Sequence, residues 1–347
     1  MFRGIVILDM ILIHFDTYFP TLVRKLLHYF DFAMDGFLFA AGLMIGAHYF
    51  DRFCIHPNLV ARRIWYRTLE LYGYYLLIVF TIIAPFYYVV LDFHDSAFFR
   101  LIVELILVKK QVGIAHILPT FIPLFLTAPL ILWLIANRRI FWVLIASFVL
   151  FLVGLHWPYL FSYADEPIFP VIIWQAYFCI GLFFGMNGFV TIEKIARSRK
   201  FAVLVNTAFL LLAVLKFGTS QIPLLETLRA EYGLFHFRRF PLNMWGFMFG
   251  ISLVFLVLHL VYRFFNVIKF FGGINTIVER FGRHSLLVFV VHAYFVYLAL
   301  AIAKLTGSVL WPSAIFGACL FSLVLITRQI ERERSERRRS HPGVRTE

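Results

Sequence analysis

Long runs of hydrophobic residues alternate with short polar segments along most of this chain. Such runs favour transmembrane helices, because a helix needs about 20 apolar residues to cross the hydrocarbon core of a bilayer. The runs are continuous and lack the period-two alternation of membrane β-barrels. Ten runs approach the required length, at residues 2–19, 31–50, 68–91, 117–136, 140–157, 168–188, 201–216, 243–262, 284–304 and 308–327. The apolar stretch 98–108 is shorter and contains Arg100 and Glu104, so we expect an interfacial or re-entrant helix there.

Composition agrees with this pattern. Of the 347 residues, 62% are hydrophobic and 15% are charged, whereas soluble domains are about half apolar and about a quarter charged. The bilayer must therefore act as the solvent for much of the surface. The sequence predicts an all-α, polytopic integral membrane bundle of about ten transmembrane helices. We expect one domain over 1–327 and a basic cytoplasmic tail over 328–347 that is disordered.

The positive charges predict an orientation. With the N-terminus placed inside and ten spans, 22 of the 32 Lys and Arg residues fall on the inner side. Inner loops carry this excess in membrane proteins, so both termini are predicted to be cytoplasmic. The net charge of +13 then reflects the inner loops and the tail. We accordingly expect membrane lipids and no nucleic acid as partners. Three widely separated cysteines predict neither a disulfide nor a metal site.

The first predicted span contains the densest set of polar residues, Arg3, Asp9, His14 and Asp16. Ionisable groups inside a membrane are candidates for function, because burying them in hydrocarbon is costly. Arg3 and His14 are eleven residues apart, which places them on one helix face about 16 Å apart. This face could hold an anionic cofactor at one end and perform proton chemistry at the other. Alternatively, Arg3 extends to the lipid phosphates and His14 bonds a neighbouring helix.

Later spans contain further polar residues. Asp35 begins a glycine-containing span, and Gln175 lies in an apolar run, where its amide positions a substrate or bonds a neighbouring helix. Ser285 and His292 share a helix face but are seven residues apart. That separation excludes a Ser–His nucleophile pair, which needs direct contact. Outside the spans, Arg239 lies in an aromatic loop that suits either sugar stacking or an interfacial aromatic belt.

Several of these segments resemble a known family of membrane enzymes. An Arg–Gly pair with a His eleven residues after the Arg, in FRGIVILDMILIH, resembles the first helix of bacterial membrane acyltransferases of acyltransferase family 3. The remaining motifs resemble the OpgC branch of that family and occur in the expected order over nearly the whole chain. They are MDGFLFAAGLMIG, HILPTFIPLFLTAPLILWLI, IIWQAYFCIGLFFG and FGRHSLLVFVVH.

The resemblance implies an O-acyltransferase of the bacterial inner membrane. Such an enzyme passes an acyl group, succinyl or acetyl, from cytoplasmic acyl-CoA to a hydroxyl of a periplasmic or envelope glycan. It implies no permanently bound cofactor, with acyl-CoA as the donor substrate. His14 then becomes the catalytic base and Arg3 a ligand of the CoA or of the acyl carbonyl. Asp35, Gln175, Ser285, His292 and Arg239 become substrate-binding candidates.

Two features depart from the family pattern. Family members usually have an acidic residue and an Arg just before the Phe–Arg–Gly, and they often have an acidic residue before the His, where this chain has Ile13. A carboxylate that orients His14 would then come from elsewhere, for example from Asp35. Two alternatives stay open, a transporter or flippase of glycan or lipid precursors and an inactive partner of a polysaccharide assembly system. A homo-oligomer, or an association with glycan-synthesis machinery, is also left open.

Overall fold

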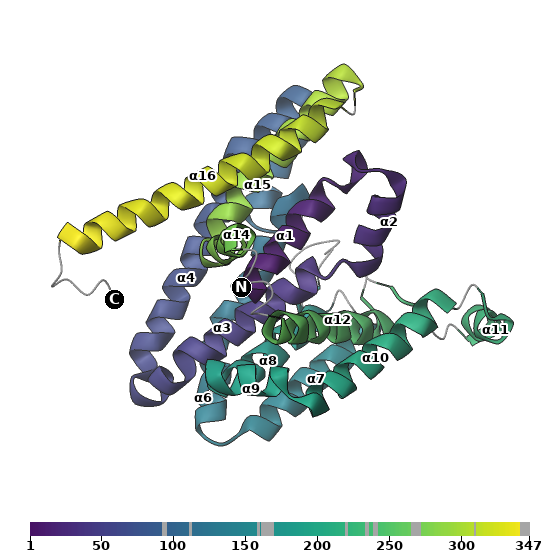
Figure 1. Cartoon of the computed structure of the whole chain (residues 1–347). Coiled ribbons are helices and arrows are strands. Elements are labelled where there is room, and N and C mark those ends of the chain that lie inside the picture. Colours follow the sequence, from purple (N-terminus) through teal and green to yellow (C-terminus); the bar gives the residue numbers. More distant parts are fainter. Residues whose placement is uncertain are drawn as a thin grey trace. The chain divides into compact units, whose positions relative to one another are not determined.

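The computed structural model of the chain is helical (Figure 1). It describes residues 1–91, 96–110, 113–157, 160, 170–218, 221–232, 236–238, 242–264, 272–308 and 310–340. No β-strand occurs among these residues, which confirms the predicted all-α class. The chain divides into two compact units, where the sequence analysis expects a single domain over 1–327. Each unit is described separately below.

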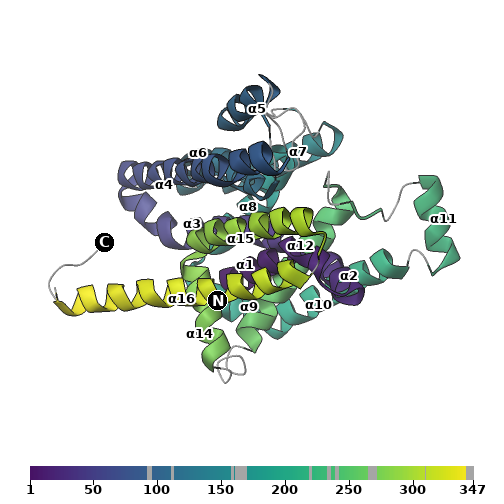
Figure 2. The same ribbon diagram turned by 90° about the horizontal axis from the view of Figure 1, so that it is seen from above.

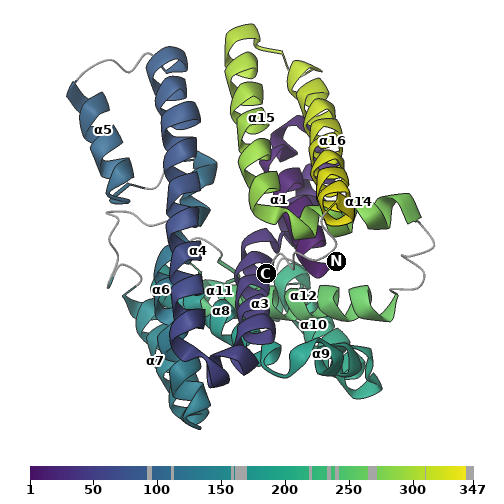
Figure 3. The same ribbon diagram turned by 90° about the vertical axis from the view of Figure 1, so that its left-hand side faces the viewer.

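The first unit joins the two ends of the chain, Met1–Asp31 and Val267–Glu347. Its described elements are α1 (Phe2–His14), η1 (Asp16–Tyr18), α2 (Thr21–Phe30), α14 (Gly272–Arg283), α15 (Ser285–Thr306) and α16 (Leu310–Ser340). Figure 3 shows α15 and α16 lying side by side, while α1 packs on α14 and α15. The side chains of Ile7, Ile11, Phe15, Phe281 and Phe289 are all but completely buried. The unit therefore has an apolar core of its own.

The second unit contains the middle of the chain, Phe32–Asn266. Its described elements are α3 (Ala33–Ile55), α4 (Pro57–Ile78), η2 (Val79–Ile83), η3 (Phe86–Val90), α5 (Ser96–Ile106), η4 (Gly113–His116), α6 (Ile117–Ala136), α7 (Ile140–His156), α8 (Val171–Gly185), α9 (Gly188–Arg197), α10 (Arg199–Gly218), α11 (Pro223–Tyr232) and α12 (Met244–Arg263). The main packed pairs are α3 with α8, α4 with α6, α7 with α8, and α10 with α12. The pairing of α4 with α6 is visible in Figure 2.

The described helices are those of a multi-pass membrane protein. Seven helical segments are long and apolar enough to span a membrane, and α8 with α9, which meet at a bend of 102°, could form an eighth. Every one of the ten predicted runs overlaps a described helix, and α5 coincides with the short apolar stretch. Three of the ten fall short of a full span, because α1, α7 and α8 have 13, 17 and 15 residues. The count of ten and the cytoplasmic location of both termini stay predictions.

Four glycines set the packing of α3 against α8. A Cβ atom on Gly42 or Gly46 would collide with a backbone carbonyl of α8, and one on Gly181 or Gly185 would collide with a carbonyl of α3. Each helix therefore presents two glycines four residues apart to the backbone of the other, the close approach typical of membrane helix pairs. The two glycines of α3 that follow Asp35 in the sequence, Gly42 and Gly46, therefore serve the packing of α3 on α8.

The basic tail differs from its prediction. Helix α16 continues beyond the apolar run to Ser340, so most of the segment expected to be disordered is helical. Ion pairs along the helix support this extension, for example that of Arg332 with Glu336, whose Nε and Oε1 atoms are 2.9 Å apart. Pairs four residues apart stabilise a helix by a few tenths of a kcal/mol each. Residues 341–347 lie outside the described part of the chain.

Candidate active site

The Arg–Gly pair near the N-terminus brings α1 into close contact with α14. A Cβ atom on Gly4 would collide with the backbone carbonyl of Val278, and one on Gly282 would lie 2.9 Å from the backbone nitrogen of Gly4. Only glycine, which has no side chain, permits two helix backbones to approach this closely. Gly4 therefore determines where the side chain of its neighbour Arg3 can reach.

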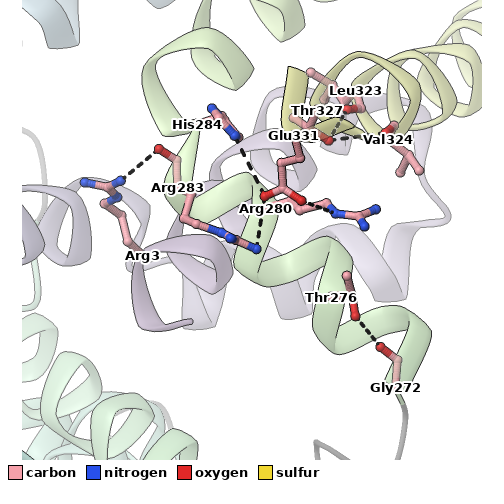
Figure 4. A network of polar contacts seen from close by, with 10 residues as sticks. All are labelled: Arg3, Gly272, Thr276, Arg280, Arg283, His284, Leu323, Val324, Thr327 and Glu331. Carbon is pink, nitrogen blue, oxygen red and sulfur yellow. Dashed lines mark hydrogen bonds and ion pairs between the residues drawn. The ribbon is translucent and has the colours of Figure 1, made fainter. Parts of the chain in front are cut away.

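Arg3 binds the C-terminal end of α14. Its Nε donates to the carbonyl oxygen of Gly282 at 2.5 Å. Its Nη2 donates to that of Arg283 at 3.4 Å, the contact drawn in Figure 4. The last carbonyl groups of a helix lack partners within the helix and carry partial negative charge, so a guanidinium group stabilises them. The side chain predicted to bind CoA is thus fixed at a helix end, beside further basic residues.

These basic residues surround one carboxylate. Glu331 of α16 is 2.8 Å from Nε of Arg280 and 3.0 Å from Nη2 of Arg283, and its Oε1 is 3.9 Å from Nε2 of His284 (Figure 4). Burial, followed by the charge of Arg334, lowers the pKa of His284, which precedes α15. Because the imidazole is then neutral at pH 7, the contacts that neutralise Glu331 come from the two arginines.

The same unit brings two histidines together. His14 ends α1 and His292 lies in α15, and the Nδ1 of His14 is 3.0 Å from the Nε2 of His292. The two rings are stacked, with centroids 5.2 Å apart and planes inclined by 19°. His292 is completely buried, whereas His14 is half-buried. Two residues that the sequence analysis treats separately, 278 positions apart in the chain, therefore form one pair.

This pair can act as a base supported by an acceptor. One ring nitrogen of a neutral histidine donates and the other accepts, so a single proton lies between the two facing nitrogens. The Nδ1 of His292 is buried and has no regular hydrogen bond to any described residue. A proton at that Nδ1 would leave the Nε2 of His292 to accept from Nδ1–H of His14. The Nε2 of His14 would then be unprotonated and basic.

A carboxylate lies close to His14 in the sequence. Asp16 in η1 is buried, and its Oδ2 contacts the imidazole of His28 and lies 3.7 Å from Nε of Arg24. These contacts join the end of α1 to α2, the next helix. The sequence analysis notes Asp16 but assigns it no role, because the periodicity that places α1 does not predict the turn after His14.

Ser285 is the first residue of α15 and is buried beside His284. It lies seven residues from His292 on that helix, and His292 contacts His14. This arrangement agrees with the exclusion of a Ser–His nucleophile pair.

Asp35 and Gln175 belong to the second unit. Asp35 is buried in the first turn of α3, and its carboxylate and the hydroxyl of Tyr177 both lie against Gly250 of α12, where a Cβ atom would collide with them. Gln175 joins α8 to α7, since its Nε2 donates to the carbonyl of Ser147 and its Oε1 accepts from the Ser147 hydroxyl, both at 2.8 Å. Of the two interpretations of Gln175, these contacts match bonding to a neighbouring helix.

The remaining candidate, Arg239, lies outside the described residues. Sequence reasoning missed Glu331, Arg280 and Arg283, which hold α16 against α14. The only signal was the spacing of the two arginines, which places them on neighbouring positions of one helix face.

The comparison with protein families places this arrangement in context. The sequence model of one family, described as OpgC protein, matches residues 1–335. The match includes α1, which carries Arg3 and His14, and α15, which carries His292. No curated protein and no solved structure matches the chain.

Proposed function

We propose that this chain, which belongs to the OpgC family, is an O-acyltransferase of the bacterial inner membrane. It moves an acyl group, succinyl or acetyl, from cytoplasmic acyl-CoA to a hydroxyl of a periplasmic or envelope glycan. The observation that supports this proposal most directly is the contact between His14 and His292. Acyl transfer to a hydroxyl needs a base that removes the hydroxyl proton, and a partly exposed histidine with a buried partner meets that need.

The reaction is a substitution at the thioester carbonyl. The hydroxyl oxygen of the glycan attacks the carbonyl carbon, the new C–O bond forms and the C–S bond to CoA breaks. His14 takes the hydroxyl proton and returns it to the sulfur of the leaving CoA. While His14 is protonated, the Nε2 of His292 accepts from its Nδ1–H. A hydrogen bond to a charged group is stronger than one between neutral groups, so His292 stabilises the protonated state.

The basic cluster at the other end of α1 suits the donor. Arg280 and Arg283 bind Glu331, and Arg3 binds the carbonyl oxygens of Gly282 and Arg283, so three guanidinium groups lie at one end of α14. Arginine is well suited to bind the phosphate groups of CoA. Arg3 is eleven residues from His14 on α1, about 16 Å along the helix. In this proposal the phosphates bind at the arginines and the thioester extends along α1 towards the histidine pair.

The other candidates keep roles as proposals. Asp35 and Ser285 would line the path of the substrates, and Arg239 would contact the glycan at the outer face. Gln175 would act through its bonds to Ser147, by holding α7 against α8.

The proposal is tested by mass spectrometry of periplasmic and envelope glycans. Cells would carry the wild-type protein, the His14→Ala variant or no protein, and the His156→Ala variant would serve as the matched control. His156 is exposed at the end of α7, in the other unit. We expect an ester-linked acyl mass with the wild type and with His156→Ala, and its loss with His14→Ala. Identical profiles in all four strains would refute acyl transfer to these glycans and favour transport or a scaffolding role.

A further inference from the structure

A cavity of about 410 Å³ lies between α6, α7 and α8 of the second unit. Its walls include Leu130 and Leu134 of α6, Val143 and Leu150 of α7, and Ile172 of α8. Three of the helices that form the second unit thus line a largely apolar space that is open on one side.

The polar groups that line the cavity already have partners. The hydroxyl of Thr127 donates to the carbonyl of Pro123 at 2.8 Å, one turn earlier on α6. Ser147 and Gln175 bond one another through two contacts of 2.8 Å. A polar ligand would have to displace these bonds at a cost, whereas a hydrocarbon chain would leave them intact. The walls therefore suit an alkyl chain.

The cavity has the length of one leaflet of a bilayer. Along α6 its lining extends from Pro123 to Leu134, eleven residues apart, which is about 16 Å of helix. The hydrocarbon core of a bilayer is about 30 Å thick, so each leaflet contributes about half of that length. An acyl chain of one leaflet matches this dimension.

Two arginines lie at one end of the cavity, in the turn between α6 and α7. The backbone N–H of Arg139 donates to the carbonyl of Leu134 at 2.9 Å, and the carbonyl of Arg139 accepts from the N–H of Val143 at 3.2 Å. Leu134 and Val143 both line the cavity. Arg139 and its neighbour Arg138 are exposed, and neither has an ion-pair partner in the described part of the chain.

Arg138 lies in an unfavourable backbone conformation at this turn, which indicates a role for its side chain. Arg138 has φ of 58°, the left-handed conformation in which glycine or asparagine commonly ends a helix. An arginine there costs about 1–2 kcal/mol relative to the right-handed conformation. Its presence is explained if the side chain serves a purpose that glycine cannot.

Aromatic side chains mark the same turn as a membrane interface. Trp133, Phe141 and Trp142 are 46%, 66% and 65% exposed, and the guanidinium of Arg139 lies 5.9 Å from the ring of Trp133. Tryptophan is enriched where membrane proteins pass between lipid tails and headgroups. The turn is therefore at the level at which phosphate groups of lipids lie.

From these observations we infer that the cavity binds an anionic phospholipid. One acyl chain of the lipid occupies the space between α6, α7 and α8, and its phosphate binds Arg138 and Arg139. The site lies entirely in the second unit. Its ligand is a bound lipid, which is neither the donor nor the acceptor of the proposed acyl transfer.

Native mass spectrometry can test this site. The full-length protein in mild detergent would receive phosphatidylglycerol and phosphatidylcholine with identical chains, and the bound lipids would be counted. The Ala146→Trp variant fills the cavity, and the matched control Ala318→Trp places the same ring on the exposed surface of α16. The double variant Arg138→Ala/Arg139→Ala changes only exposed side chains. Its control is Arg199→Ala/Lys200→Ala, which removes two exposed charges at the start of α10.

We expect the wild type and both controls to retain lipid and to prefer phosphatidylglycerol. Filling the cavity should abolish retention of both lipids. Removing the two arginines should lower the ratio of bound phosphatidylglycerol to phosphatidylcholine by about 30-fold, the effect of two charges at an anionic headgroup. Retention by the filled variant at the wild-type level would overturn the cavity as the site. The double variant should fold normally because its changes are exposed. An unchanged lipid ratio in this variant would overturn the inference whatever the result with the filled cavity.

Discussion

Replacing His292 by alanine tests how the histidine pair works. The substitution removes the acceptor that faces Nδ1 of His14 at 3.0 Å and leaves His14 itself in place. A hydrogen bond to a charged group contributes about 1.5–3 kcal/mol. If His292 stabilises protonated His14 in the transition state, its loss should slow acyl transfer by about 10- to 150-fold. Replacing His14 should cost more, about 10²- to 10⁴-fold, because it removes the base itself.

The assay is acyl transfer in inverted membrane vesicles that enclose a glucan acceptor, with succinyl-CoA or acetyl-CoA added outside and the ester product measured by mass spectrometry. Four proteins are compared, the wild type, His14→Ala, His292→Ala and the double variant. The His292→Gln variant provides a further comparison, because its amide oxygen can accept a hydrogen bond and should restore part of the rate. Since His292 is completely buried, thermal unfolding of each purified variant controls for loss of the fold.

The double variant decides between two accounts of His292. If it acts through His14, the double variant should be no slower than His14→Ala alone, because residues that act as a unit are non-additive. If the two losses multiply, His292 has a separate role and the paired mechanism is wrong. A wild-type rate for His292→Ala would refute the argument more directly, because the observed contact would then have no catalytic consequence.

Two further predictions concern the fold. Gly181→Ala should lower the unfolding temperature of the detergent-purified protein, because its methyl group collides with the carbonyl of Phe39, and such overpacking costs about 1–3 kcal/mol. The control Gly73→Ala, whose methyl group meets no atom within 4 Å, should be neutral or stabilising. Equal losses of unfolding temperature in the two variants would refute the packing argument. Glu331→Gln should speed amide hydrogen exchange over the end of α16, because the charge that binds two arginines of α14 is lost. Glu333→Gln should not, because Glu333 accepts a hydrogen bond from Gln329 and the amide oxygen of a glutamine can still accept it. Equal exchange in both variants would contradict the assigned role of Glu331.

The sequence predicts the helices well, because hydrophobic length is a local property. Each apolar run became a helix, and Arg3 and His14 lie on α1 as their spacing requires. The runs were less informative about length, since α1 ends at His14 and the chain turns at Asp16. A run of apolar residues does not show whether its last turns are helical, because the loop after a helix can be apolar as well.

Contacts between distant helices could not be predicted in the same way. His14 and His292 were both candidates, but a single sequence contains no signal that α1 meets α15. The role of Glu331 was hidden for another reason. It lies in a segment rich in arginine, where a carboxylate looks like one member of a solvated charge run. Only the position of α14 shows that two arginines from elsewhere in the chain bind it.

The packing of the first unit explains the positions of Arg3, Gly4 and His14 on α1 together. Gly4 allows α1 to touch α14, that contact places Arg3 on the last carbonyls of α14, and α15 begins immediately afterwards. The short connection from α14 to α15 therefore links the position of Arg3 to that of His292, which in turn meets His14. A bulkier residue at Gly4 would shift both ends of α1 together. Arg3, His14 and His292 are thus held in place by one packing arrangement of α1, α14 and α15.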